Sequence, residues 1–106
     1  MISPPRVFDL IDEIDSTNAE ALRRIEAGDH GPGVVVGLSQ TGGRGRRGRR
    51  WESPKGGLYF TYYATTGAPL RTLSLLGFVA ALAVADVVRS AGADAVTLKW
   101  PNDVLV

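Results

Sequence analysis

The sequence predicts an α/β (α+β) fold in which helices pack against a mixed β-sheet. Segments typical of strands alternate with segments typical of helices along the chain, without an internal repeat or a linker. The 106 residues are the usual length of one domain, and 44% apolar with 22% charged residues is near the average of soluble globular proteins. These values exclude a disordered or fibrous chain.

Four segments have the pattern of strands. Residues 7–14 alternate apolar with acidic side chains, and residues 34–40 are β-branched and apolar, as expected of a buried strand. Residues 58–63 carry aromatic side chains on both faces, and residues 95–100 are again strand-like. Residues 101–103 then predict a turn, and residues 104–106 the start of another strand.

A first helix should begin near residue 16. Thr17 and Glu20 have the spacing of a capping box, and the neighbouring side chains can also accept from backbone amides. The apolar residues Ala21, Leu22 and Ile25 then fall on one face, and Gly28 is placed to end the helix.

A second helix is predicted over residues 72–91. It is rich in alanine and leucine and apolar nearly all round up to Asp86, so we expect it to be buried on most sides. The longest uncharged stretch, residues 72–85, is shorter than a membrane span requires.

Several classes of site are excluded by composition. The chain has no cysteine and one histidine, which excludes disulfides, thiolate metal sites and multi-histidine metal sites. The first residues lack a basic region followed by an apolar run, so no signal peptide is indicated. A reducing, cytoplasmic setting fits these observations best.

Charge is concentrated in a loop rich in arginine and glycine, residues 41–57. Five arginines lie within residues 44–50, while residues 1–30 have a formal charge of −4. Such a cluster must be solvated or meet an anion. Its glycines allow positive φ and close approach to a ligand, its arginines suit carboxylates and phosphates, and Gln40 and Thr41 should stand at the mouth of a pocket. Trp51 could stack on a flat ring or act as a lid.

From this loop alone, a small-molecule anion site is no better supported than a solvated loop, a localisation signal or a nucleic-acid patch. The spacing matches neither a P-loop nor a dinucleotide fingerprint.

Three segments in order carry a resemblance to a known family. They are DSTN at 15–18, QTGGRGRRGRRW at 40–51 followed by Gly57-Leu58-Tyr59, and KWPND at 99–103. Together they resemble the biotin–protein ligases, or biotin–[acetyl-CoA-carboxylase] ligases; Gly42 stands where that family commonly has alanine. The resemblance implies a fold similar to class II aminoacyl-tRNA synthetases. It also implies that biotin and ATP react with Mg²⁺ to give biotinyl-5′-AMP, and that the biotinyl group passes to a lysine of a biotin carboxyl carrier protein.

The resemblance also implies roles for individual residues. Catalytic Arg44 and Arg46, with the Gly45 backbone, would meet the biotin carboxylate and the adenylate phosphate. The positions that would bind biotin are Ser16, Thr17, Asn18 and Gln40. The loop that would close over the ligand includes Arg47, Arg49 and Trp51. The nucleotide side would consist of Lys99, Asn102 and Asp103, with Asp103 either holding Mg²⁺ or orienting the attacking lysine.

Purely structural roles are the alternatives at some of these positions. Ser16 or Thr17 could serve only as a helix cap, and residues 101–103 only as a turn. Trp51 and Trp100 could each belong to a core, and Trp100 is the better suited to one.

The same resemblance sets expectations for the whole chain. Residues 1–106 would form the N-terminal part of the catalytic domain, with no N-terminal helix-turn-helix domain and with the C-terminal part absent. We therefore expect little or no ligase activity from these residues alone, no operator DNA binding and no membrane association. The oligomeric state is left open. A lipoate ligase or transferase is the alternative enzyme, and an arginine-loop nucleic-acid module is the alternative binding protein.

Overall fold

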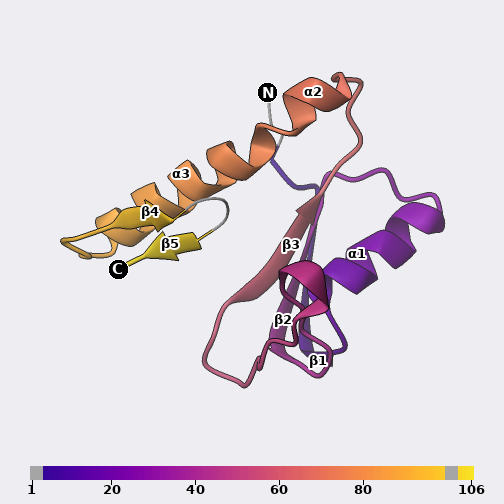
Figure 1. Ribbon diagram of the computed structural model, residues 1–106. Coiled ribbons are helices and arrows are strands. Elements are labelled where there is room, and N and C mark those ends of the chain that lie inside the picture. The colour runs from indigo at the N-terminus through magenta and orange to yellow at the C-terminus, as the bar shows by residue number, and fades with distance from the viewer. Residues whose placement is uncertain (1–3, 100–102) are drawn as a thin grey trace. The chain divides into compact units, whose positions relative to one another are not determined.

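The computed structural model describes residues 4–99 and 103–106 (Figure 1). The predicted roles of Asn102 and Trp100 and most of the predicted turn at 101–103 therefore lie outside the described residues. The chain divides into two compact units, residues 1–66 and residues 67–106. The sequence showed no linker at this division.

The first unit contains a three-stranded sheet and one long helix. Its elements are β1 (Val7–Ile14), α1 (Thr17–Glu26), β2 (Gly33–Gln40), the short 3₁₀ turn η1 (Arg46–Gly48) and β3 (Tyr59–Tyr63). β2 lies in the centre, parallel to β1 and antiparallel to β3. The predicted mixed sheet is thus confirmed, and the strands begin and end within about one residue of the predicted positions.

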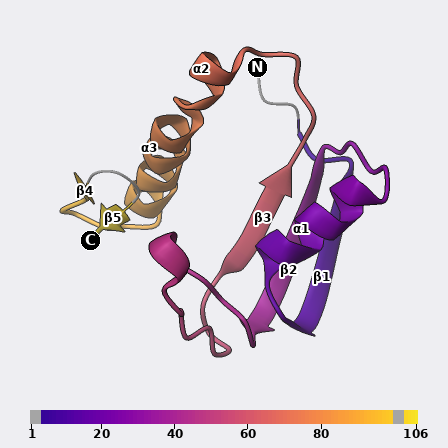
Figure 2. The same cartoon turned by 45° about the vertical axis from the view of Figure 1, so that its right-hand side comes forward.

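The helix α1 packs on one face of this sheet (Figure 2). Ala21 of the helix, Val35 of the central strand and Tyr63 of β3 form the buried core, and Ile11 of β1 packs against it. The opposite face of the sheet exposes large apolar side chains, including Phe8 and Phe60.

The predicted apolar face of α1 is only partly correct. Ala21 is buried, but Leu22 and Ile25 are exposed. The strip that faces the sheet runs instead through Thr17 and Ala21, which are one turn apart.

The cap of α1 also differs from the predicted capping box. Ser16 is the N-cap, and its hydroxyl accepts from the Ala19 amide at 3.2 Å. Glu20 is one residue too far along to return a bond to the cap, and its carboxylate binds Arg23 and Arg24 instead. The helix ends as predicted, with Gly28 at φ +98° just after it.

The second unit holds α2 (Leu70–Leu73), α3 (Leu76–Ser90) and an antiparallel pair, β4 (Thr97–Lys99) and β5 (Asp103–Leu105). The predicted helix over 72–91 therefore begins earlier and is interrupted. At the interruption the Ser74 hydroxyl donates to the Arg71 carbonyl at 2.7 Å, a local bond that competes with helix continuation.

The expectation that this helix is buried on most sides is wrong. Ala85 is its one buried residue, and side chains such as Phe78, Leu82 and Val87 are exposed. Within its own unit α3 packs against β4 and β5, and two three-residue strands are too short to cover four turns of helix.

By length and composition, residues 70–90 could cross a membrane, with a mean hydropathy of 1.8 over the most apolar window. The apolar helical segment is therefore longer than the uncharged residues 72–85, on which the expectation of no membrane span was based. Core helices of water-soluble proteins meet the same criterion, so the measure alone does not assign a membrane role.

Candidate functional site

The candidate site lies where the parallel strands β1 and β2 both end. The Thr41 amide donates to the Ile14 carbonyl at 2.9 Å, and the Gly42 amide donates to the Asp15 carbonyl at 2.7 Å. These bonds hold the start of α1 beside the start of the arginine-rich loop. The carboxyl ends of neighbouring parallel strands are the usual place for ligands in open α/β sheets.

The first turn of α1 contributes the predicted residues Ser16, Thr17 and Asn18. Ser16 is half-buried and caps the helix, Thr17 is buried, and Asn18 is exposed. The Thr17 hydroxyl lies 2.9 Å from that of Thr61 on β3, so it is held by the protein itself. The Thr17 and Ala19 amides also have acceptors within the protein, the side chains of Gln40 and Ser16.

Gln40 connects this helix turn to the returning arm of the loop. Its Oε1 accepts from the Thr17 amide at 2.8 Å, and its Nε2 donates to the Ser53 hydroxyl at 3.2 Å. Ser53 is buried, and its carbonyl accepts from the Gln40 amide at 2.9 Å. The sequence analysis did not identify Ser53 or Thr61, because no local pattern indicates a partner that the fold brings from a distant segment.

The arginine-rich loop folds back on itself as an irregular hairpin. Arg44 and Arg50 form an antiparallel bridge, and the Gly45 amide donates to the Arg49 carbonyl at 2.6 Å. At the tip, η1 places Arg47 at φ 60° and Gly48 at φ 72°, both in the left-handed region. The loop predicted over residues 41–57 thus has a defined shape, because these backbone bonds join its two arms.

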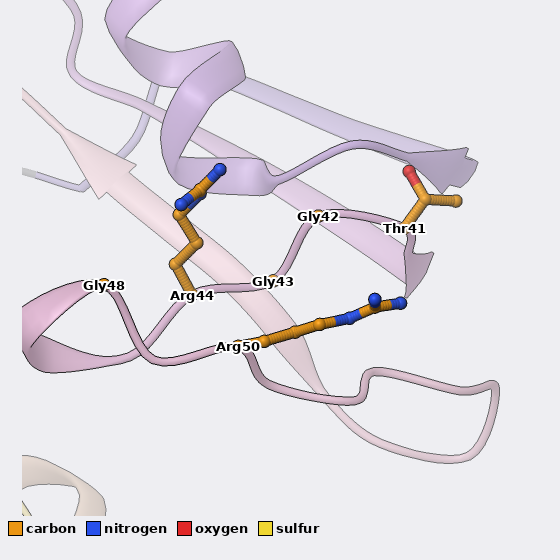
Figure 3. A pocket seen from close by; sticks show the side chains of 6 residues that line it. All are labelled: Thr41, Gly42, Gly43, Arg44, Gly48 and Arg50. Carbon is orange, nitrogen blue, oxygen red and sulfur yellow. The ribbon is translucent and has the colours of Figure 1, made fainter.

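A hollow of about 230 Å³ is formed by this hairpin (Figure 3). The side chains of Arg44 and Arg50 leave the loop in different directions beside it. Its lining consists of Thr41, Gly42, Gly43, Arg44, Gly48 and Arg50. Thr41 therefore stands at a pocket as predicted, and Arg50 is a lining residue that the sequence did not single out.

Most of the arginines here are available to an anion. Among the described residues, Arg50 has the one ion pair of the loop's arginines, with Glu52 at 3.6 Å between two exposed side chains. No described carboxylate pairs with the other four, which are Arg44, Arg46, Arg47 and Arg49. Unpaired guanidinium groups around a hollow suit a carboxylate or a phosphate.

The glycines of the loop act differently from the prediction. Of Gly42, Gly43, Gly45 and Gly48, Gly48 alone adopts positive φ. At Gly43 an added Cβ would lie 2.6 Å from the Ser53 hydroxyl oxygen and 2.8 Å from the Trp51 carbonyl oxygen. At Gly45 it would meet the Trp51 indole, which is 61% exposed. Gly43 is therefore needed for close packing of the loop on itself, whereas the exposed indole beside Gly45 can move aside.

The predicted nucleotide residues belong to the second unit. Lys99 is exposed and Asp103 is half-buried, and they are cross-strand partners in the β4–β5 pair. Within residues 4–99 and 103–106, no cluster of three or more histidines, aspartates and glutamates could hold a metal ion. A single Asp103 carboxylate fits Mg²⁺ when substrate phosphates supply further ligands, as is usual for this ion.

An ion-pair network fixes the turn between β1 and α1. The Arg23 guanidinium beside Asp15, together with the Ser16 amide, lowers the pKa of the Asp15 carboxyl to about 2. Arg24 and Arg23 likewise lower the pKa of Glu20, whose two oxygens they share. These carboxylates are therefore ionised at neutral pH.

The first unit is therefore a mixed α/β domain with a cationic, glycine-rich hollow at the carboxyl ends of two parallel strands. The chain belongs to the biotin/lipoate A/B protein ligase family, whose sequence pattern matches residues 10–106.

Similar proteins support this assignment. A biotin–[acetyl-CoA-carboxylase] ligase of Paracoccus denitrificans is 44% identical over 94 residues, which are 87% of this chain and 39% of that protein. A Leishmania major biotin protein ligase, solved with biotinyl-5-AMP, is 31% identical with a TM-score of 0.78, over 96% of this chain and 48% of the other.

An Aquifex aeolicus biotin protein ligase, solved with biotin and ATP, is 33% identical with a TM-score of 0.74, over 95% of this chain and 42% of the other. The chain thus spans less than half the length of these relatives.

Proposed function

We propose that this chain contributes to an ATP-dependent biotin–protein ligase that makes biotinyl-5′-AMP and transfers the biotinyl group to a lysine of a biotin carboxyl carrier protein. The observation that carries the proposal is the hollow at the ends of β1 and β2, where Arg44 lacks a described carboxylate partner. Solved relatives with biotinyl-5-AMP, and with biotin and ATP, support the choice of ligands.

The first step brings two anions together. A biotin carboxylate oxygen attacks the α-phosphorus of ATP, a new P–O bond forms, and pyrophosphate leaves. Arg44 and Arg46 would offset the negative charge on both reactants and on the phosphorus as it reacts, and the Gly45 backbone would let the ligand approach closely. In the second step the lysine amine attacks the acyl carbon and AMP leaves.

The start of α1 would bind biotin. The ureido group of biotin has both donors and acceptors, which the Ser16 hydroxyl and the exposed Asn18 amide can match. Thr17 and Gln40 are tied to Thr61 and Ser53, so in this proposal they mainly shape the cradle.

The hairpin would close over the reactive adenylate. Arg47 and Arg49 lie at its exposed tip, and the exposed Trp51 indole could cover a flat ring. Closure would shield the mixed anhydride from water. The nucleotide side would use Lys99, Asn102 and Asp103. Mg²⁺, when present with the nucleotide, would neutralise phosphate charge, and Asp103 would either bind it or orient the lysine.

The test is biotin-dependent exchange of labelled pyrophosphate into ATP by the complete gene product. We expect Arg44→Ala and Arg46→Ala each to lower the exchange rate about 100-fold, the size of effect seen when one charge-stabilising donor is removed. Arg89→Ala is the matched control, because Arg89 is half-exposed on α3 and pairs with Asp86 alone among the described carboxylates.

Three outcomes would contradict the proposal. The wild type could show no exchange with biotin, or it could prefer lipoate, which would indicate the lipoate branch of the family. Equal exchange rates in Arg44→Ala, Arg46→Ala and the wild type would remove the hairpin from the reaction.

A further inference from the structure

Arg23 forms a two-pronged ion pair with Asp15. Its Nη1 donates to Asp15 Oδ2 at 2.9 Å and its Nη2 to Asp15 Oδ1 at 2.8 Å. Two parallel bonds between planar groups fix the orientation of the carboxylate as well as its position.

Asp15 is the residue where the cradle and the loop are joined. Its Oδ1 accepts from the Ser16 amide at 2.8 Å, and its carbonyl accepts from the Gly42 amide at 2.7 Å. An added Cβ at Gly42 would lie 3.2 Å from that same carbonyl oxygen, so the two backbones are in close contact. A change in the backbone conformation of Asp15 would therefore displace both the N-cap of α1 and the first residues of the hairpin, and the held carboxylate, which binds the Ser16 amide, opposes such a change.

Arg23 is itself held in place. Its Nε donates to Glu20 at 3.0 Å, and Glu20 is shared with Arg24, which also reaches Asp9 of β1 at 2.6 Å. The side chains of Arg23 and Asp15 are each about half exposed, so water screens the attraction between them and its contribution to folding is small. The pair therefore fixes the orientation of the Asp15 carboxylate more than it stabilises the fold.

We propose that Arg23 is a positioning residue: acting through Asp15, it holds Ser16 and Gly42 in the arrangement that binds biotin. The inference rests on the proposed biotin site and extends it to a side chain outside the three motif segments.

The experiment compares steady-state kinetics of variants of the complete gene product, well below their melting temperatures. Arg23→Ala is expected to raise the KM for biotin about tenfold with kcat changed by less than about twofold, because ground-state binding is lost while the chemical groups remain. Asp15→Asn keeps an acceptor for the Ser16 amide but loses the charge, and should raise KM similarly. The double variant should resemble either single variant, because both changes remove one interaction.

Arg24→Ala is the matched control, since it removes an α1 arginine with two carboxylate partners but no bond to Asp15. It should lower the melting temperature and leave the KM for biotin unchanged.

Two results would overturn the inference while the wild type still reacts with biotin. Arg23→Ala and Asp15→Asn could keep the wild-type KM, or Arg24→Ala could raise KM equally. If Arg23→Ala does not fold, the KM of Asp15→Asn for biotin tests the inference alone. A wild type without biotin-dependent exchange would instead refute the proposed function.

Discussion

Gly43 shows how a single residue without a side chain shapes the site. It is buried where the two arms of the hairpin meet, and its carbonyl accepts from the Trp51 amide at 2.9 Å. The sequence indicated glycines but not their purpose, because a crowded glycine and a glycine at positive φ look the same in a sequence. The distinction depends on Ser53, which is ten residues away and reaches Gly43 only when the loop has folded.

Replacing Gly43 by alanine should therefore destabilise the hairpin. The new methyl group would be forced against the Trp51 carbonyl and the Ser53 hydroxyl, and such overpacking typically costs about 1–3 kcal/mol. Urea unfolding measures the loss. Gly67→Ala is the control, because a Cβ there meets open space. Equal stability of Gly43→Ala and the wild type would show that the loop does not pack in this way.

At the scale of elements, periodicity predicted more than capping chemistry did. The alternation over residues 7–14 and the β-branched run over residues 34–40 predict the bounds of β1 and β2 to within one residue. Packing in a sheet requires those patterns of apolar side chains. The N-cap of α1 was ambiguous because Ser16 and Thr17 are both good caps. Burial decides between them: Thr17 faces the sheet and bonds to Thr61, which leaves Ser16 to cap.

Ser16→Ala should remove this cap and cost about 1 kcal/mol of stability, the usual effect of losing an N-cap acceptor. Chemical denaturation monitored by far-UV circular dichroism would detect it. Ser90→Ala is the matched control, because that hydroxyl bonds to the Asp86 carbonyl within α3 and caps no amide. If the two serine variants lose equal stability, the hydroxyl of Ser16 is not an effective cap.

At the scale of the molecule, the motifs indicated which segments meet at the candidate site but not the bonds between them. DSTN and the arginine-rich segment indicated which residues to expect, and the parallel register of β1 and β2 brings them together. The pairs Arg23–Asp15 and Gln40–Ser53 could not be read from the sequence, because they depend on how α1 docks on the sheet. The exposure of α3 could not be predicted either, because an apolar sequence does not show which other elements are present to cover it.

The charge network of the first unit predicts stability limits at both ends of the pH scale. Arg23 and the Ser16 amide hold the pKa of Asp15 at about 2, and the Tyr63 hydroxyl lowers the pKa of Asp29. A carboxyl whose pKa is lower in the folded state stabilises that state above its ordinary pKa near 3.8. The contribution is lost as the pH falls through the folded value. Because the Arg23–Asp15 pair is half exposed and screened by water, the free energy of unfolding should drop only modestly between about pH 4 and pH 2.

The same network acts with the opposite sign at alkaline pH. The hydrogen bond that Tyr63 donates to Asp29 at 2.6 Å raises the pKa of the phenol above its ordinary value of 10.0. This contribution is complete below pH 10 and is lost as the pH rises through the raised pKa. Chemical denaturation across the pH range would measure both limits. Tyr63→Phe should abolish the alkaline loss and the part of the acid loss due to Asp29, whereas Arg23→Ala should reduce the acid loss alone. An alkaline loss that persists in Tyr63→Phe would show that another group carries it.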